Sequence, residues 1–386
     1  MIEKLYRLEA CSNLPLVSKM KSKRAITMKI GFIARSTLGA MGEAALTNYV
    51  RLVQEHHDVF VIQTPGQEKI VRAPSTGLQL YDVPASPVAE RRRAIYDVLR
   101  STRPDIVHMI QSPYCFDDFM TLKPVFPDIK WCLDFRSPHV GPRDAPSLKR
   151  FQQMHLHVDG LMTHSLESLR TNIRRRWRAA VEIPPGVDTA SIPFAPARDR
   201  QDGSTRLRLV YVGSLSRTRK IDALLDMIAQ AVKVTPNLHV DFFGAGNAEE
   251  ELKGHLIKAN LIDRVVFQGQ VDQATLWQRM NSYDAGIAYV PNEMFGSAPS
   301  LKSIEYAALG LPVLASRTPG HVSFRRRHGF AFNFFSNTPG GLATVLQTGI
   351  DRSTKTIQTN RKAAEALDWR RIIETRLLPV YQKLLQ

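Results

Sequence analysis

The feature of this sequence that most constrains its fold is an alternation, repeated twice, of short apolar runs with longer amphipathic segments. Lys29–Ala34 and Leu207–Val212 are runs of six residues, which is the length of a strand rather than of a helix. Apolar residues recur at helical spacing in the segments that follow, Glu43–Glu55 and Lys220–Val234. Short apolar strands separated by amphipathic helices predict a parallel sheet that is covered on both faces. We therefore predict an α/β fold with doubly wound sheets.

The remaining predicted strands fall into two groups, separated by a break in the alternation. They are Asp58–Gln63, Ile106–Ile110, Lys130–Asp134 and Gly160–Thr163 in the first group, and Leu238–Phe243, Val265–Gln268, Ala285–Val290 and Pro312–Ala315 in the second. The break contains the rigid turn Ile183–Asp188 and a stretch rich in Pro, Ala, Arg and Asp. A chain of 386 residues is long enough for two domains with separate cores. We predict Rossmann-like domains at 28–195 and 205–368, facing a central cleft where a ligand would bind.

Residues 1–27 are predicted to be a basic, poorly ordered extension rather than part of the fold. They contain six Lys and Arg residues but only two Glu residues, and no continuous apolar stretch of the kind found in signal peptides. The first clear strand begins directly after Met28, which makes Met28 an alternative start of the natural protein. A basic arm that contacts a membrane is the other interpretation.

The charge of the chain predicts an anionic partner. The sequence has 52 Lys and Arg residues against 36 Asp and Glu residues, a formal net charge of +16 at pH 7. Such a balance fits nucleotide phosphates, lipid headgroups or nucleic acid. Three cysteines form no disulfide framework and no metal-binding spacing, which favours a reducing compartment. Since no apolar run approaches the roughly 18 residues of a spanning helix, we expect a cytoplasmic protein, either soluble or peripheral on the cytoplasmic face of the membrane.

The segment Pro299–Ser316 is predicted to place a carboxylate beside an apolar helix face. Pro299 suits a first helical turn, and apolar residues then recur at helical spacing. Glu305 lies roughly 40° from Leu301 around the helix, at the edge of this face. A carboxylate in that position is costly unless something donates hydrogen bonds to it. The alternative is a surface helix on which Glu305 pairs with Lys302.

Cationic residues and glycines gather where predicted strands end. Arg219 and Lys220 lie beside the start of a helix, where cations are unfavourable unless an anion lies between them. Glycines at strand ends let a ligand approach the backbone closely. They are Gly39, Gly42, Gly244 and Gly246. These features indicate a bound nucleotide diphosphate, with solvated charges and ordinary turns as the alternatives. The sequence contains neither a P-loop motif nor G-x-G-x-x-G, which argues against ATPases and dinucleotide-dependent enzymes.

In the order of its motifs the chain resembles glycosyltransferase family 4, the retaining enzymes of GT-B fold. The resemblance covers residues 28–386, and Pro299–Ser316 is its most specific segment. Other similar segments in the second half are Tyr211–Ser216, Phe243–Gly246, Val266–Val271 and Tyr283–Ala288. The first half matches more loosely, through Arg103–His108, Leu133–Arg136, Asp159–Ser165 and Ile183–Asp188. Residues 369–386 resemble the helix that crosses back onto the first domain in this fold.

The resemblance implies that the second domain binds a nucleotide-diphosphate sugar and the first domain receives the acceptor. Glu305 matches the second glutamate of the family's E-x7-E motif, which holds the ribose hydroxyls. Arg219 matches the basic residue that binds the diphosphate, with Lys220 beside it. The other positions implied to contact the donor are Gly39, Gly42, Gly213, Ser214, Gly244, Gly246, Ser297, Pro299, Ser300 and Leu301. Such enzymes need no metal or other cofactor, so cationic side chains and helix amides would stabilise the departing diphosphate.

The chain departs from the family pattern at three positions. Ser297 stands where the first glutamate of E-x7-E is expected, and Ser214 stands where a basic residue usually follows the strand. The first-domain histidine that often touches the donor sugar has no clear counterpart. Arg136 is nearest and His139 follows three residues later, so both are candidates for sugar or acceptor contacts.

A subgroup of the family has the form Pro-x-x-Lys-x-x-Glu-Tyr, which Pro299–Tyr306 fits. In that form Lys302 precedes Glu305 by one helical turn and would supply the phosphate contact that Ser214 cannot. We therefore expect Arg219, Lys302 and Glu305 to be the catalytic set. Because retention is generally assigned to attack on the same face, with the leaving phosphate oxygen accepting the proton, we nominate no general base or nucleophile.

The basic segment Arg170–Arg178, with Trp177, is predicted to lie on one helix of the first domain. It is either a solvated face or a contact with an anionic membrane or a lipid-diphosphate acceptor, where each cation adds about 1 kcal/mol. We do not expect a nucleic-acid partner, because no recognised binding module accompanies the charge. Three histidines without metal-like neighbours are predicted to be structural. They are His108, His155 and His157.

From these observations and the resemblance we predict a retaining, hexosyltransferase-type glycosyltransferase. It would move a sugar from a nucleotide-diphosphate donor to a hydroxyl of a polysaccharide, a lipid-linked glycan or a similar acceptor. Two alternatives remain. One is a non-catalytic binding or scaffold protein of the same fold, because Ser297 replaces a motif glutamate. The other is a sugar-nucleotide epimerase, which would convert its donor without an acceptor.

Overall fold

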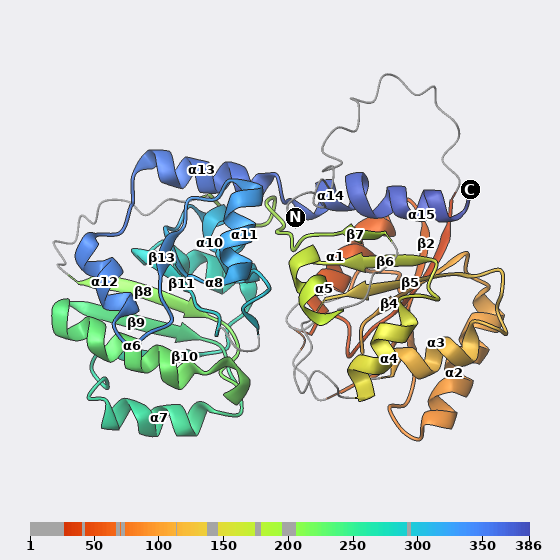
Figure 1. The fold of residues 1–386 in the computed structure, drawn as a ribbon, viewed down its shortest axis with the longest axis horizontal. Helices are drawn as coiled ribbons and strands as arrows, with labels where there is room; N and C mark the ends of the chain where they lie inside the picture. Colours follow the sequence, from red (N-terminus) through yellow and green to blue (C-terminus); the bar gives the residue numbers. More distant parts are fainter. Residues whose placement is uncertain are drawn as a thin grey trace, which may run out of the picture.

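The computed structural model describes residues 27–40, 43–66, 70, 74–112, 114–136, 146–173, 179–194, 206–291 and 295–386. These residues form two α/β units side by side, each built around one parallel sheet (Figure 1). The predicted α/β fold with doubly wound sheets is thereby confirmed. The predicted extension 1–27 lies outside the described residues except for Thr27.

The first unit contains a seven-stranded sheet in the order β3-β2-β1-β4-β5-β6-β7, with every pair parallel. The strands are β1 (Lys29–Ile33), β2 (Asp58–Gln63), β3 (Gln79–Asp82), β4 (Ile106–Ile110), β5 (Lys130–Phe135), β6 (Gly160–Thr163) and β7 (Ala180–Glu182). The helices are α1 (Ala44–Val53), α2 (Val88–Thr102), α3 (Cys115–Leu122), α4 (Pro146–Met154) and α5 (Leu166–Asn172). Helices α2, α3 and α4 lie on one side of the sheet and α1 lies on the other (Figure 1).

The second unit contains a six-stranded parallel sheet in the order β10-β9-β8-β11-β12-β13. The strands are β8 (Leu207–Val212), β9 (Leu238–Phe243), β10 (Val265–Gly269), β11 (Ala285–Ala288), β12 (Val313–Ser316) and β13 (Asn333–Phe335). The helices are α6 (Ile221–Val234), α7 (Glu249–Lys258), α8 (Gln273–Met280), α10 (Leu301–Leu309), α11 (Pro319–His328), α12 (Gly341–Thr348) and α13 (Thr354–Glu365), with a 3-10 turn at Arg217–Arg219. Both sheets thus have the reversal of strand order typical of doubly wound folds.

Helix α10 begins and ends for local reasons that the sequence shows. Ser300 is its N-cap and Gly310 its C-cap, the latter with φ 84°, a left-handed conformation that glycine adopts without strain. Pro299 therefore precedes the N-cap instead of lying in the first helical turn as predicted. The buried face of α10 includes Ile304 and Tyr306, and the Tyr306 hydroxyl accepts a hydrogen bond of 2.9 Å from the backbone N–H of Val212. That bond fixes α10 against the end of β8.

The C-terminal helices cross from the second unit to the first (Figure 1). They are α14 (Trp369–Ile372), a π-helical turn at Ile373–Leu377, and α15 (Leu378–Leu384). Trp369 packs against Tyr49 of α1, with ring centres 5.7 Å apart. The hydroxyl of Tyr381 lies 2.6 Å from Nδ1 of His108 in β4. Both aromatic side chains are buried, so this segment belongs to the core of the first unit.

The histidines predicted to be structural occupy different environments. His108 is buried in the middle of β4. His155 is also buried, whereas His157 is exposed. No group of three or more His, Cys, Asp or Glu side chains among the described residues could hold a metal ion. In the same part of the chain, no helix is long and apolar enough to cross a membrane.

Candidate active site between the two sheets

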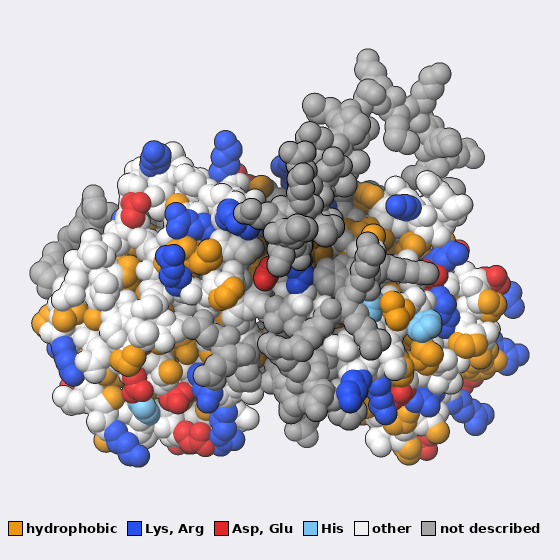
Figure 2. Space-filling view, in the orientation of Figure 1, with side chains coloured by type: hydrophobic (Ala, Val, Ile, Leu, Met, Phe, Trp, Pro, Cys, Tyr) orange, Lys and Arg blue, Asp and Glu red, His pale blue; other side chains and the backbone are white. Residues whose placement is uncertain are grey.

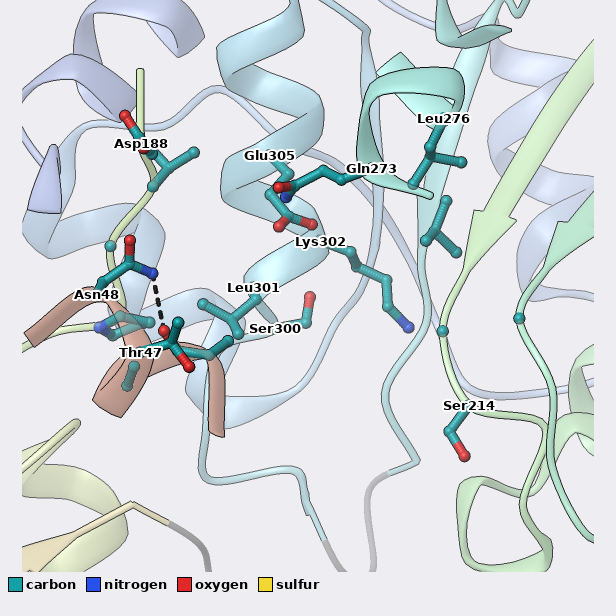
Figure 3. Close-up of a pocket in the computed structure, with 18 of the residues that line it drawn as sticks. Thr47, Asn48, Asp188, Ser214, Gln273, Leu276, Ser300, Leu301, Lys302 and Glu305 are labelled. Carbon is teal, nitrogen blue, oxygen red and sulfur yellow. Dashed lines mark hydrogen bonds between the residues drawn. The ribbon is translucent and has the colours of Figure 1, made fainter. Parts of the chain in front are cut away.

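The candidate site is a cavity of about 560 Å³ between the two units. One wall is formed by residues that follow β1, β5 and β6, and the other by residues that follow β8, β9 and β11. The carboxyl edge beside β1 and β8, where the strand order reverses, is where doubly wound sheets bind ligands. Thr47 and Asn48 of α1 face Lys302 and Glu305 of α10 across this space (Figure 3).

Glu305 lies one helical turn beyond Lys302, and both side chains point into the cavity (Figure 3). Within the described part of the chain, nothing donates a hydrogen bond to the Glu305 carboxylate. Burial raises the pKa of Glu305 to about 7, and the positive charge of Lys302 offsets this only in part. A carboxylate without protein donors can accept hydrogen bonds from ligand hydroxyls. The predicted surface pair with Lys302 therefore does not describe this residue, because both side chains line the cavity.

Two cations lie on the same wall. The Nζ atom of Lys302 is 3.9 Å from the centre of the Tyr211 ring, and the guanidinium carbon of Arg219 is 4.2 Å from the centre of the Phe295 ring. Neither cation forms a salt bridge within the residues that the structure describes. Burial, together with the charge of Arg219, lowers the pKa of Lys302 well below its usual value. An anion bound between them would favour the charged form of Lys302, so the pair suits a phosphate or diphosphate.

The strand ends beneath these cations are held together by two glycines. Gly244, with φ 144°, lies so close to β8 that a Cβ atom there would be 1.9 Å from the carbonyl oxygen of Gly213. A Cβ atom at Gly213 would be 3.1 Å from the Nζ atom of Lys302. The glycines thus allow close packing of β8 against β9 and leave room for the Lys302 side chain.

Most of the residues expected to contact the donor or acceptor do line the cavity. Those that line it are Gly39, Arg136, Gly213, Ser214, Arg219, Gly244, Pro299, Ser300, Leu301, Lys302 and Glu305. Lys220, Gly246 and Ser297 are described but do not line it. Gly42 and His139 lie outside the described residues.

The three residues that do not line the cavity have local roles instead. Lys220 is exposed at the start of α6 with φ 50°, and its carbonyl accepts a hydrogen bond of 3.2 Å from the Tyr289 hydroxyl. Gly246 packs against the backbone, because a Cβ atom there would be 2.3 Å from the carbonyl carbon of Leu215. Ser297 lies in the turn closed by the 3.0 Å bond from the N–H of Ala298 to the carbonyl of Phe295. Both ends of that turn line the cavity.

Arg136 dominates the wall that the first unit contributes. Its Nε atom lies 2.8 Å from Oδ2 of the fully buried Asp134, and its guanidinium stacks on Tyr49 at 5.1 Å. Burial lowers the pKa of Arg136 to about 9. The Nη2 atom of Arg136 is buried and has no hydrogen-bond partner. Asp134 therefore fixes the guanidinium of this lining residue and leaves its Nη2 atom without a hydrogen-bond partner.

Six polar residues of this wall were not predicted as site residues from the sequence. They are Arg35, Thr47, Asn48, His164, Asp188 and Ser191. His164 directly follows β6, and Arg35 follows β1 after one residue. The rule that ligands bind at the carboxyl ends of strands could therefore have identified both. Asp188 forms a 3.0 Å ion pair with Arg51, and that contact joins segments far apart in the sequence. Such pairing leaves no signal in a single sequence.

The prediction that one helix carries the whole basic segment 170–178 is wrong. Helix α5 ends at Asn172, because Ile173 has the extended conformation φ −113°, ψ 102°. Arg170 lies on α5 and its side chain is 56% exposed, 3.9 Å from Glu167. Arg174, Arg175, Arg176, Trp177 and Arg178 lie outside the described residues.

Comparison with known proteins finds similarity to glycosyltransferases over part of the chain. Residues 197–347 match the family model described as "Glycosyl transferases group 1". A segment of 153 residues is 31% identical to phosphatidyl-myo-inositol mannosyltransferase of Mycolicibacterium smegmatis, and it spans 38% of this chain and 38% of that protein. Each match covers well under half of the chain, so it concerns a segment rather than the whole protein.

Solved structures match nearly the whole chain. Sucrose-phosphate synthase of Thermosynechococcus elongatus aligns with a TM-score of 0.75 and 18% identity, over 92% of this chain and 99% of that one. The Anabaena protein HepE in complex with UDP-glucose aligns with a TM-score of 0.67 and 14% identity, over 92% and 98% of the two chains. The chain has the GT-B fold. Its two sheet-containing units face each other across the cavity described above.

Proposed function

We propose that this GT-B chain is a glycosyltransferase that moves a sugar from a nucleotide-diphosphate donor to an acceptor hydroxyl. The observation that carries the proposal is the wall formed by Arg219, Lys302 and Glu305. Among the described residues, the two cations form no salt bridge and nothing donates a hydrogen bond to the carboxylate beside them. This combination is complementary to a nucleotide diphosphate, which offers phosphate oxygens to the cations and ribose hydroxyls to the carboxylate. The match of residues 197–347 to the group 1 glycosyltransferases supports the same assignment.

In the proposed reaction the bond between the sugar's anomeric carbon and the diphosphate oxygen breaks, and an acceptor oxygen forms the new bond to that carbon. The acceptor's proton passes to the departing phosphate oxygen, so that the configuration is retained. Arg219 and Lys302 stabilise the negative charge that develops on the diphosphate. Burial lowers the pKa of Lys302, and a bound diphosphate would oppose that shift by favouring the charged form of the side chain.

The acceptor is proposed to bind against the first unit, on the wall that contains Asn48 and Arg136. A glycan or a lipid-linked glycan fits a cleft of this size, and one relative is named as acting on phosphatidyl-myo-inositol. We also propose a peripheral position at an anionic membrane surface, supported by the exposed Arg170 and the net charge of +16. Liposome co-sedimentation should then require anionic lipid and weaken at high salt. Equal sedimentation with neutral lipid would contradict the membrane contact.

The test of the catalytic proposal is release of nucleotide diphosphate from nucleotide sugars. We expect slow release of UDP from UDP-glucose or of GDP from GDP-mannose by the full chain, and its loss in Arg219→Ala. Arg217→Ala is the matched control, because Arg217 is exposed and paired with Glu251 outside the cavity. Binding without release would indicate a scaffold protein instead. Conversion of the donor to another nucleotide sugar would indicate an epimerase.

A further inference from the structure

Two side chains of the first unit meet at the cavity from neighbouring strands. Arg136 directly follows β5 and His164 directly follows β6. The two strands are paired in parallel with Phe135 opposite Thr163. Arg136 and His164, the residues that follow these two, therefore lie opposite each other. Both residues line the cavity, and the charge of Arg136 is close enough to lower the pKa of His164.

Each of these side chains has one polar atom engaged by protein and one without a partner. In His164, Nδ1 lies 3.1 Å from the carbonyl oxygen of Phe135, and Nε2 is buried without a hydrogen-bond partner. In Arg136, Nε donates to Asp134 and Nη2 is buried without a partner. The side chain of Arg136 is 9% exposed and His164 is 6% exposed. Buried polar atoms are rarely left unpaired, which points to a ligand group that fills this position.

The hydrogen-bonding chemistry of the pair defines what that group must be. A carbonyl oxygen only accepts, so Nδ1 of His164 carries the proton and Nε2 is an acceptor. Burial and the nearby Arg136 lower the pKa of His164 to about 4, so the ring stays neutral at physiological pH. Nη2 of Arg136 can only donate. The missing group must therefore accept one hydrogen bond and donate another.

A hydroxyl can both accept and donate a hydrogen bond. An ionised phosphate or carboxylate oxygen only accepts, so it would be repelled by the lone pair on Nε2 of His164. The local charge agrees with an uncharged ligand group, because the buried Asp134 already pairs with Arg136. This contrasts with the opposite wall, where neither Arg219 nor Lys302 forms a salt bridge within the described part of the chain. The cleft thus has an anion-binding side and a neutral side.

We propose that His164 and Arg136 form a hydroxyl-recognition subsite, in which one sugar hydroxyl accepts from Nη2 of Arg136 and donates to Nε2 of His164. The inference rests on the proposed function, since that function supplies a sugar to the cleft. The hydroxyl belongs either to the sugar of the donor or to the acceptor. His164 is a specificity-determining residue in both cases.

The test compares His164→Leu, which removes the acceptor atom, with His164→Gln, which retains one. His239→Leu is the matched control, because Nδ1 of His239 also lies 3.1 Å from a backbone carbonyl, but His239 does not line the cavity. In the donor arm, calorimetry gives the Kd of UDP, UDP-glucose, GDP and GDP-mannose with the full chain. In the acceptor arm, NMR titration gives the Kd of glucose, mannose and myo-inositol, with and without UDP or GDP. Glucose 6-phosphate is titrated in the same way as the charged comparison for glucose.

If the hydroxyl belongs to the donor, His164→Leu weakens binding of the nucleotide sugar about 3- to 10-fold and leaves the nucleotide diphosphate unchanged. If it belongs to the acceptor, the same loss appears for an uncharged sugar. His164→Gln should recover most of either loss, and unchanged binding of UDP or GDP shows that the variants fold.

The subsite is contradicted if His164→Leu changes neither arm. It is equally contradicted if glucose 6-phosphate binds more tightly than glucose and this preference is lost in His164→Leu. That result would mean that the pair binds an anion. Failure of the proposed function is a separate outcome. It would appear as no release of nucleotide diphosphate by the wild-type chain, while the sugar-binding arms still decide the subsite.

Discussion

At the scale of single residues, Glu305 is a charge that the fold does not compensate. Its folded pKa of about 7 exceeds the ordinary 4.5, so folding favours the protonated form. By linkage, ionising this carboxyl costs stability as the pH rises through 7, and costs nothing below about pH 4.5, where both the folded and the unfolded states are protonated. A residue kept at such a cost is typical of functional sites.

Glu305→Gln should therefore stabilise the ligand-free protein at high pH while weakening its binding of nucleotide. We expect the free energy of unfolding to rise by on the order of 2 kcal/mol at pH 8 and to change little at pH 4.5. Urea denaturation at the two pH values measures this difference. An equal effect at both would mean that the Glu305 charge is not the cause.

Lys302 should contribute to phosphate binding and not to nucleoside binding. Lys302→Ala removes one of two cations that lack an acidic partner, so we expect the Kd of UDP or GDP to rise about 10- to 100-fold, since hydrogen bonds to charged groups contribute about 1.5–3 kcal/mol. The affinity for uridine or guanosine should stay the same. Calorimetry with nucleotide and nucleoside separates the two. Unchanged nucleotide affinity would remove Lys302 from the site.

At the scale of elements, the sequence patterns located the central strands well and the peripheral ones poorly. Asp58–Gln63, Ile106–Ile110 and Leu207–Val212 were predicted with the bounds that the structure shows. Their buried apolar side chains create the signal. Strands β3, β7 and β13 were not predicted, because they are short edge strands of four, three and three residues, and β3 is largely exposed.

The candidate site divides in the same way. The residues on α10 could be predicted because one short motif contains both the helix and its polar groups. The first-unit wall was predicted only in part. Arg136 follows a predicted strand and was a candidate, whereas its position opposite His164 arises only through the pairing of β5 with β6. Lys220 was assigned to the site from its position beside Arg219, but the left-handed backbone at Lys220 leaves its side chain exposed.

The junction of β8 and β9 should not tolerate a side chain at Gly244. Gly244→Ala would place a Cβ atom 1.9 Å from a backbone oxygen, so we expect a loss of about 3 kcal/mol in the free energy of unfolding and weaker nucleotide binding. Gly254→Ala is the control, because Gly254 lies in α7 with nothing within 4 Å of its Cβ position. That variant should gain up to about 1 kcal/mol. Equal thermal stability of the two variants would contradict the close approach.

At the scale of the whole molecule, the C-terminal helices join the two units. Their contact with the first unit includes a buried polar pair, Tyr381 with His108, behind the cleft residue Arg136. Basic side chains are visible on both units in the face that Figure 2 shows. The crossing helices therefore lie where they can hold the walls of the cleft in position.

Tyr381→Phe should weaken the attachment of these helices. The change leaves Nδ1 of the buried His108 without its partner, and we expect a loss of about 1–3 kcal/mol in the free energy of unfolding. Tyr96→Phe is the matched control, because the Tyr96 ring packs on Phe126 at 5.4 Å and its hydroxyl has no hydrogen bond within the described residues. Urea denaturation measures both variants. A loss of the same size in Tyr96→Phe would contradict the assigned role of the pair.

The central claim is that the second unit binds a nucleotide diphosphate at Arg219, Lys302 and Glu305, and calorimetric titration with UDP and GDP tests it most directly. The account predicts saturable binding of at least one of them by the full chain, weakened at least about 10-fold in Glu305→Ala and unchanged in Glu251→Ala, which lies outside the cavity. Binding of neither nucleotide, or equal affinity in the wild type and Glu305→Ala, would contradict it.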